Sequence, residues 1–381
     1  MTKFNIVSSD SHVVEPPNLW TERMDVRKWG NLIPHVESGD PFDYWVVNGQ
    51  IMGTIGTSSS AGLRYTQPQD IILEGSFKDV PPGGYDPHAH VKDLEKDGVS
   101  SDVLYASLGA SMYGLADQVF IRDLFEAYNH WLQDFCKTYP DNLNGIGLVL
   151  IDDQVEAGIS QMERAASLGL KGVMIPVGPR PSETYDKPMY DRFWAAAQDM
   201  NMPVSLHLGT LRPGNVRLME NGKVTQTAVE RCNNEYAVRY SLGHMILSGV
   251  FERYPGLRVV NVEHEISWLP FFMHRMDVTY IERPTQAIYR YKGDMKPSDY
   301  MRSNVYHSFQ EDGPGIRLRD IIGIDRIMWG NDYPHAESTF PESQRILTSI
   351  LDGVPEDEQE LIVGGNCRNL YNLSQPPTVR A

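Results

Sequence analysis

Five residues of metal-binding type are spread along almost the whole chain, each at or just past the end of an expected β-strand. They are Asp10, His12, His207, His264 and Asp332. Imidazole and carboxylate groups are ligands that suit Zn, Mn and Fe. A barrel that closes on itself brings the carboxyl ends of distant strands together at one face. The sequence therefore predicts a metal-dependent enzyme, with all five residues as candidate ligands.

Spacing and residue type suggest separate roles for these candidates. Asp10 and His12 are two positions apart, so they face the same side of an extended strand and can reach one ion. Asp332 can be both a ligand and a proton carrier, because a cation keeps a carboxylate ionised and acidifies a bound water. His264 is a candidate ligand or a general acid that polarises a substrate group. We therefore predict Asp332 and His264 as the catalytic residues.

Several other polar residues are weaker candidates. Arg212 follows the His207 strand and is the candidate for binding a substrate carboxylate. Candidates for a second metal ion, or for support behind the first, are Glu263, His335, His307 and His244. Glu263 adjoins His264 and would point the opposite way along a strand. Any one of these side chains is as readily structural, whereas ligand types at several strand ends together favour a site.

The elements that must position these residues alternate between strand and helix. Expected strands cover residues 4–7, 103–105, 143–149, 172–175, 204–208, 259–262, 305–309 and 327–329. The clearest helix, over 117–138, repeats apolar residues near the helical period. Eight strands separated mostly by helices predict an α/β fold, a (β/α)8 TIM-like barrel, over one domain of residues 1–381. A doubly wound open sheet is the alternative, but no GxGxxG follows the first strand.

Residues 13–85 interrupt this alternation. They contain Pro16-Pro17, Ser58-Ser59-Ser60 and Gly83-Gly84, with a hairpin pattern at Tyr44–Ile51 around Asn48-Gly49. An insertion of this length is more typical of a cap or loop layer over a site than of a separate domain. We therefore expect an N-terminal insertion after strand one.

Composition limits the classes of molecule that this protein is expected to bind. The formal net charge of −16 repels a phosphate backbone, which argues against nucleic-acid binding. No apolar run approaches the ~20 residues that span a bilayer, so we expect no membrane partner. The three cysteines form no CxxC pair, as expected in a reducing compartment. We therefore expect a cytoplasmic protein that acts on a small molecule.

Four motifs, in this order, resemble the second amidohydrolase family, which contains aminocarboxymuconate-semialdehyde decarboxylase and metal-dependent aromatic-acid decarboxylases. They are Asp10-Ser11-His12-Val13-Val14-Glu15-Pro16, Leu168-Gly169-Leu170-Lys171-Gly172-Val173, Gly249-Val250-Phe251-Glu252-Arg253-Tyr254-Pro255 and Gly330-Asn331-Asp332-Tyr333-Pro334-His335. The resemblance implies Asp10, His12, His207 and Asp332 as metal ligands and His264 as the catalytic histidine. The family often begins with His-x-His or Glu-x-His. Asp10 is a harder ligand, which favours Mn or Fe somewhat more.

The resemblance leaves several functions open. The first is non-oxidative decarboxylation of a small aromatic or unsaturated carboxylic acid, with one divalent ion, Zn or Mn before Fe. The second is hydrolysis of an amide or lactone. The third is oxygen chemistry at a dinuclear Fe or Fe/Mn site. A non-enzymatic barrel with a structural metal is the remaining reading. We also expect a homodimer, or a hetero-oligomer with a paralogue.

Overall fold

Eight parallel strands form one sheet in the computed structural model, which describes residues 4–39, 42–71, 75–152, 154–213 and 228–374. In sheet order they are β1 (Val7–Val13), β5 (Ser101–Ala106), β6 (Leu143–Leu148), β7 (Gly172–Gly178), β8 (Val204–Leu211), β9 (Val259–Val262), β10 (Val305–Phe309) and β11 (Ile327–Trp329). Hydrogen bonds join β1 to the segment after β11, with Asp332 N donating to Asp10 O at 2.8 Å. These features confirm the (β/α)8 barrel.

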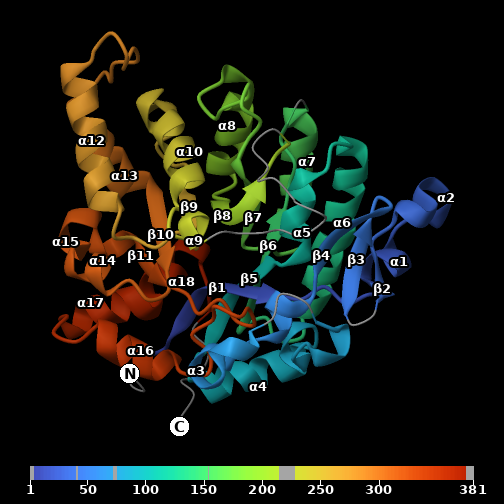
Figure 1. Cartoon of the computed structure of the whole chain (residues 1–381). Helices are drawn as coiled ribbons and strands as arrows, with labels where there is room; N and C mark the ends of the chain where they lie inside the picture. The colour runs from blue at the N-terminus through green and yellow to red at the C-terminus, as the bar shows by residue number, and fades with distance from the viewer. Residues whose placement is uncertain (1–3, 40–41, 72–74, 153, 214–227, 375–381) are drawn as a thin grey trace.

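The helices surround the sheet (Figure 1). Before β5 lie α1 (Leu19–Arg23), α2 (Val26–Trp29), α3 (Leu63–Thr66) and α4 (Pro87–Asp97). Between β5 and β9 lie α5 (Leu108–Ser111), α6 (Gln118–Cys136), α7 (Val155–Ser167), α8 (Asp191–Asp199), α9 (Ala228–Arg231), α10 (Tyr236–Leu247) and α11 (Val250–Arg253). After β9 come α12 (Leu269–Glu282), α13 (Pro297–Asn304), α14 (Gly313–Arg317), α15 (Arg319–Ile322), α16 (Ser343–Ile350), α17 (Glu356–Glu360) and α18 (Asn366–Tyr371).

Local sequence explains where the best-defined helices begin and end. The Asp117 side chain accepts from the N–H groups of Val119 and Phe120, a cap that contributes about 1 kcal/mol to α6. Asp86 caps α4 in the same way, Pro87 occupies its first turn, and Gly98 ends it with φ of +72°. The buried face of α6, which includes Leu124, packs on β6, so the helix stabilises the barrel wall.

The prediction for the first strand was wrong. It was expected at residues 4–7, whereas β1 covers Val7–Val13 and is buried along its whole length. The misplacement arises because the polar run from Ser8 to His12 does not match an apolar strand pattern. In this barrel those side chains bond to one another and to neighbouring strands, so a polar sequence can occupy an interior strand. Asp10 and His12 therefore lie within the strand.

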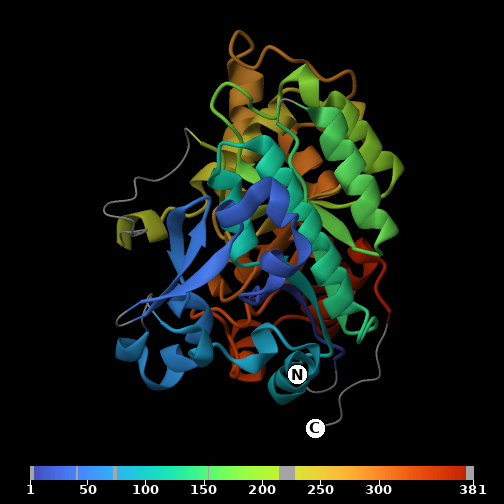
Figure 2. The same cartoon turned by 90° about the vertical axis from the view of Figure 1, so that its right-hand side faces the viewer.

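The expected insertion follows β1 and ends at α4. It contains a separate three-stranded antiparallel sheet of β2 (His35–Ser38), β3 (Asp43–Val47) and β4 (Gln50–Thr54). Asn48 and Gly49 both have positive φ, as the predicted hairpin turn requires. Figure 2 shows this blue layer in front of the barrel helices. Its role as a cap, and the single domain of residues 1–381, stay predictions.

One part of the insertion touches loops at the carboxyl end of the barrel. Arg64 ion-pairs with Glu311, which follows β10, at 2.6 Å. Tyr65 donates to the carbonyl of Ser338, which follows β11, at 3.4 Å.

Within the described ranges, no helix is both long enough and apolar enough to cross a membrane.

Candidate metal centre

Asp10 and His12 enter the barrel interior from a bulged strand. The pairing of β1 with β5 shifts register between Ser8 and Ser11, so β1 carries one extra residue there. Ser9 and Asp10 can therefore both face inward, while Ser8 and Ser11 both bond to Asn331 on the other side. Alternation then returns His12 to the interior beside Asp10. The expectation that Asp10 and His12 face the same side is consistent with this geometry.

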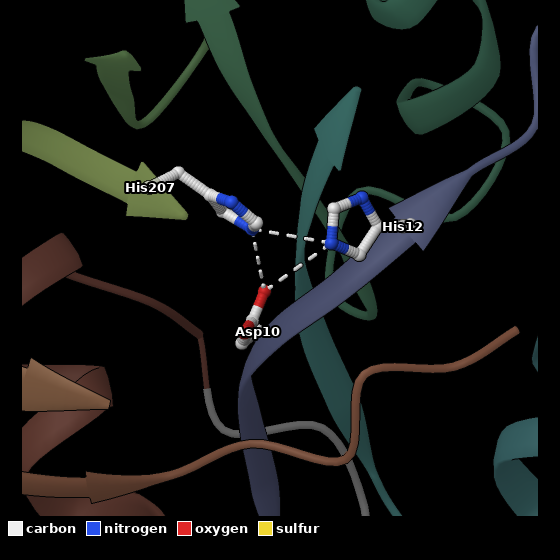
Figure 3. Close-up of side chains that lie close together, drawn as sticks. All are labelled: Asp10, His12 and His207. Atoms are coloured by element: carbon white, nitrogen blue, oxygen red, sulfur yellow. Dashed lines mark hydrogen bonds and ion pairs between the residues drawn. The ribbon is translucent and has the colours of Figure 1, made fainter. Parts of the chain in front are cut away.

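Residues from β8 and from the segment after β11 meet this pair. His207 Nε2 lies 3.4 Å from Asp10 Oδ1 and 3.2 Å from His12 Nε2. His12 Nε2 lies 3.4 Å from Asp332 Oδ1. Figure 3 shows Asp10, His12 and His207 pointing toward one another from two strands. The structure thus brings together four of the five residues with which the sequence argument began.

The orientation of the two imidazole rings leaves lone pairs facing the centre. His12 Nδ1 lies 3.1 Å from the carbonyl of Ala106, and His207 Nδ1 lies 3.0 Å from that of Leu208. A carbonyl can only accept, so in each ring Nδ1 carries the hydrogen and Nε2 is a free acceptor. Burial is the main cause that lowers the pKa of His12 well below its usual value, so this ring is neutral. Neutral imidazole with an anchored Nδ1 is the form that binds metals.

The two aspartate carboxylates also present acceptor atoms to this space. Both carboxylate oxygens of Asp10 are buried without a hydrogen-bond donor within the described residues. The Asp332 carboxylate is equally buried and has His335 Nδ1 2.9 Å from its Oδ1. Burying unpaired anionic oxygens is costly unless a cation or proton compensates them. Two imidazole lone pairs and two carboxylates converging on one space therefore fit a divalent metal ion. Asp10, His12 and His207 form one set of ligand atoms within 4.8 Å of one another.

Three acidic residues that follow β9 or β11 have a backbone conformation that L-amino acids rarely adopt. Glu263 and Glu265 after β9, and Asp332 after β11, have φ of +64°, +53° and +56°. Such conformations are strained in residues other than glycine and asparagine, and they concentrate at functional sites. The left-handed turn also ends strand alternation, so Glu263 Oε2 lies 3.7 Å from His207 Nδ1. Glu263 thus points toward the cluster. Strand alternation alone had predicted that it would point away.

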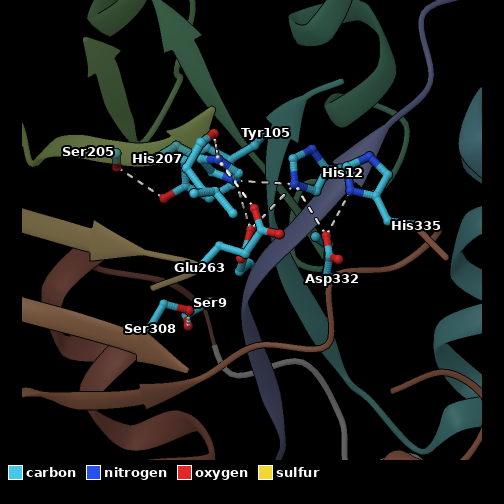
Figure 4. A network of polar contacts seen from close by, with 12 residues as sticks. Ser9, His12, Tyr105, Ser205, His207, Glu263, Ser308, Asp332 and His335 are labelled. Atoms are coloured by element: carbon cyan, nitrogen blue, oxygen red, sulfur yellow. Dashed lines mark hydrogen bonds and ion pairs between the residues drawn. The ribbon is translucent and has the colours of Figure 1, made fainter. Parts of the chain in front are cut away.

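His335 lies against Asp332. Its Nδ1 lies 2.9 Å from Asp332 Oδ1, its Nε2 lies 2.9 Å from Ser107 Oγ, and its ring stacks on His12 (Figure 4). Burial alone would lower the pKa of His335, but the Asp332 carboxylate outweighs it and raises that pKa. Burial raises the pKa of Asp332, although His335 opposes the rise. His12, Asp332 and His335 also form a second set of ligand atoms.

His264 is near the cluster without joining either set of ligand atoms. Both of its ring nitrogens are buried and have no hydrogen-bond partner among the described residues. Burial, with a smaller contribution from His207, lowers its pKa to about 3, so the ring is neutral. Its free nitrogens suit a hydrogen bond to a bound molecule better than a structural role. Whether it acts as ligand or as proton donor stays a prediction.

Three candidates lie elsewhere among the described residues. Arg212 is fully buried, ion-pairs with Asp152 and donates to two carbonyls, which leaves only its Nη2 without a partner. His307 contacts Asn261 and has its pKa lowered to about 3 by burial; it neighbours the inward-facing Ser308 and so points outward. His244 on α10 ion-pairs with Asp186 at 3.1 Å. None of the three belongs to the sets of converging ligand atoms.

Sequence reasoning also missed residues that shape the centre. Ser107 directly follows β5, so the rule that selected the other strand-end residues would have found it. Tyr105 packs against His207 with ring centroids 4.9 Å apart and its hydroxyl is 3.0 Å from Ser205 Oγ. Arg231 on α9 ion-pairs with Glu337, which follows β11. No sequence signal distinguishes Tyr105 or Arg231 from ordinary core and surface residues.

Comparison with known sequences matches this chain to one family. The model of the family described as amidohydrolase matches residues 96–373, which include His207, His264 and Asp332. Gamma-resorcylate decarboxylase from Rhodococcus jostii (strain RHA1) is 25% identical over 227 residues. That alignment covers 56% of this chain and 66% of the relative, so it spans just under two thirds of the relative's length.

Comparison with solved structures agrees on the fold. An amidohydrolase from Mycobacterium avium subsp. paratuberculosis K-10 superposes with a TM-score of 0.76 at 17% identity, covering 97% of this chain and 98% of that chain. A 5-carboxyvanillate decarboxylase from Novosphingobium aromaticivorans DSM 12444, complexed with manganese and 4-hydroxy-3-methoxy-5-nitrobenzoic acid, has a TM-score of 0.65 at 18% identity. That match covers 98% of this chain and 97% of the other.

Proposed function

The chain belongs to the amidohydrolase family, and we propose that it removes CO₂, without oxidation, from a small aromatic or unsaturated carboxylic acid. The observation that carries this proposal is the convergence of two imidazole Nε2 atoms and two carboxylates in a buried space. Similarity to gamma-resorcylate decarboxylase supports decarboxylation over hydrolysis. The fold shared with 5-carboxyvanillate decarboxylase is consistent with it.

Asp10, His12, His207 and Asp332 would hold the metal ion. Manganese is the first candidate, because it accompanies the related structure and because two carboxylates make a hard ligand set. When bound, the ion supplies a Lewis acid that stabilises negative charge on substrate oxygens. The chain's own task is then to orient the acid and to deliver one proton.

The reaction needs one proton and no oxidant. A proton from Asp332 or His264 forms a new C–H bond at the carbon that carries the carboxylate. The C–C bond then breaks, and its electron pair returns to the ring or double bond as CO₂ leaves. Burial of the cluster excludes water that would compete for this proton. Arg212, whose Nη2 has no partner among the described residues, stays the predicted contact for a substrate carboxylate.

CO₂ release from hydroxybenzoates tests this proposal. The manganese-loaded protein is expected to release CO₂ from at least one acid in a panel that includes 2,6-dihydroxybenzoate and 5-carboxyvanillate, in equal amount to the acid consumed. Unsubstituted benzoate is the matched substrate control. When the same reaction is carried out in H₂¹⁸O, the aromatic product should contain no ¹⁸O. Label in the organic product would instead indicate hydrolysis, and no turnover of any acid would count against decarboxylation.

Metal stoichiometry tests the centre independently of substrate. We expect about one equivalent of Mn or Zn per chain by ICP-MS after purification without added metal, since one group of ligand atoms is deeply buried. Removal by a chelator should abolish turnover, and added Mn²⁺ should restore it. Two equivalents including iron, together with oxygen uptake, would favour the dinuclear oxygenase, because His335 completes the second set of ligand atoms.

A further inference from the structure

Asn331 connects β1 with the segment after β11, and these two segments supply the candidate carboxylates Asp10 and Asp332. It is fully buried, and its Oδ1 lies 3.0 Å from Ser8 Oγ and 2.8 Å from Ser11 Oγ. Its backbone N–H donates to Ser8 Oγ at 2.9 Å. Ser8 and Ser11 mark the two ends of the bulge in β1 that allows Asp10 to face inward. The Asn331 side chain therefore holds the outer side of the bulge.

The same amide oxygen shapes the turn that carries Asp332. Oδ1 accepts from the N–H of Tyr333 at 3.1 Å, two residues along, so the side chain spans Asp332 in an Asx turn. Asp332 has φ of +56°, a conformation that needs support from its surroundings. Asn331 Oδ1 thus contacts the backbone just after Asp332 and the serines at both ends of the bulge that contains Asp10.

The opposite end of the amide is anchored to the helix layer. Asn331 Nδ2 donates to Asp97 Oδ2 on α4 at 3.3 Å. Asp97 in turn accepts from the backbone N–H of Ser343 at 3.1 Å and from its hydroxyl at 2.5 Å, at the start of α16. Donors surround Oδ1 and an acceptor faces Nδ2, so the amide has one orientation that satisfies every partner. Two helices fix it there.

We propose that Asn331 is a positioning residue that sets the separation and orientation of Asp10 and Asp332 as a pair, without touching the ion. This inference rests on the proposed metal centre and deepens it. An apolar side chain at position 331 would release Ser8, Ser11 and the Asp332 turn together. Both carboxylates would then lose their fixed geometry while every ligand remained present.

The experiment measures manganese binding and geometry rather than turnover alone. Asn331→Ala is expected to weaken Mn²⁺ affinity about 10- to 100-fold, the usual cost of removing a residue that orients metal ligands. At saturating metal, the EPR spectrum of bound Mn²⁺ should broaden, because the ligand geometry is distributed. The control is Asn304→Ala on α13, which removes another buried amide, one that donates to the carbonyls of Pro255 and Leu257. It should leave affinity and spectrum unchanged.

A pair of isosteric variants separates positioning from loss of stability. Asn331→Asp keeps the acceptor for Ser8 and Ser11 but places a second carboxylate against Asp97, so affinity should fall. Adding Asp97→Asn to this variant restores one donor and one acceptor between positions 97 and 331. The Mn²⁺ affinity and the EPR spectrum should then recover toward those of the wild type. This pair decides the question if Asn331→Ala does not fold.

Several outcomes would overturn the proposal. They are unchanged Mn²⁺ affinity in Asn331→Ala, an equal loss in the Asn304→Ala control, or no recovery in a folded Asp97→Asn, Asn331→Asp protein. If the wild type itself bound no Mn²⁺, Zn²⁺ or Fe²⁺, the metal centre of the proposed function would fall first, which is a distinct result.

Discussion

Replacing Asp332 by Asn is expected to lower the rate of CO₂ release by about 10²- to 10⁴-fold, the range for losing a positioned proton donor. The substitution preserves shape and removes the charge and the transferable proton. Asp332 Oδ1 is 3.4 Å from His12 Nε2 and 2.9 Å from His335 Nδ1, so the same change also weakens the ligand set. The measurement is kcat and KM for the best acid of the panel, with metal content determined on the same sample.

Metal content separates the two roles of Asp332. If the variant keeps its metal and loses turnover, Asp332 is the proton carrier; if it loses both and excess Mn²⁺ restores turnover, Asp332 is chiefly a ligand. Asp312→Asn is the control, because this buried carboxylate also follows a barrel strand but only accepts from backbone N–H groups at Ile266, Ser267 and Gly315. Wild-type turnover in Asp332→Asn would contradict both roles.

Replacing His90 by Ala is expected to lower the free energy of unfolding by about 3–5 kcal/mol, the usual cost of leaving one partner of a buried ion pair uncompensated. His90 Nε2 lies 2.7 Å from Asp102 Oδ2, and its Nδ1 donates to the carbonyl of Gly83 at 2.7 Å. Both side chains are fully buried between α4 and β5. Urea unfolding followed by circular dichroism measures the change.

A surface pair provides the matched control for this stability prediction. His130 lies 3.3 Å from Glu126 on the exposed side of α6, and His130→Ala should change stability by no more than ~0.5 kcal/mol. An equal loss in the two variants would mean that burial of the His90 pair contributes nothing special. A loss below ~1 kcal/mol in His90→Ala would contradict the prediction, since it is smaller than the desolvation cost of one unpaired charge.

The same pair implies a direction for the pH dependence of stability. Burial opposes the charged imidazolium, but Asp102, the Gly83 carbonyl and Asp93 together outweigh it and raise the pKa of His90. A raised folded pKa means that the contribution is complete below the ordinary value near 6.5. It is lost as pH rises through the raised value. Wild type should therefore lose part of its advantage over His90→Ala on the alkaline side.

Much of the barrel could be predicted from sequence, because hydrophobic periodicity and turn-forming residues are local properties of the chain. The strand at residues 204–208 alternates apolar and polar side chains, and α6 repeats apolar positions at the helical period. The hairpin around Asn48-Gly49 followed from the positive φ that this pair tolerates. The strand at 4–7 failed because β1 is a buried strand of polar side chains, which only its partners make stable.

The sequence by itself determined which ligand-type residues lie in or just after the barrel strands, and so identified Asp10, His12, His207 and Asp332 as candidate ligands. It could not determine where Glu263 points, because a left-handed turn after β9 overrides strand alternation. It could not show that Arg212 is tied to Asp152, or that His307 points away from the cluster. Nor could it reveal that the Asn331 side chain bonds to Ser8, a residue 323 positions away in the sequence. Each of these depends on contacts between distant segments, which exist only after the barrel closes and which local sequence patterns do not encode.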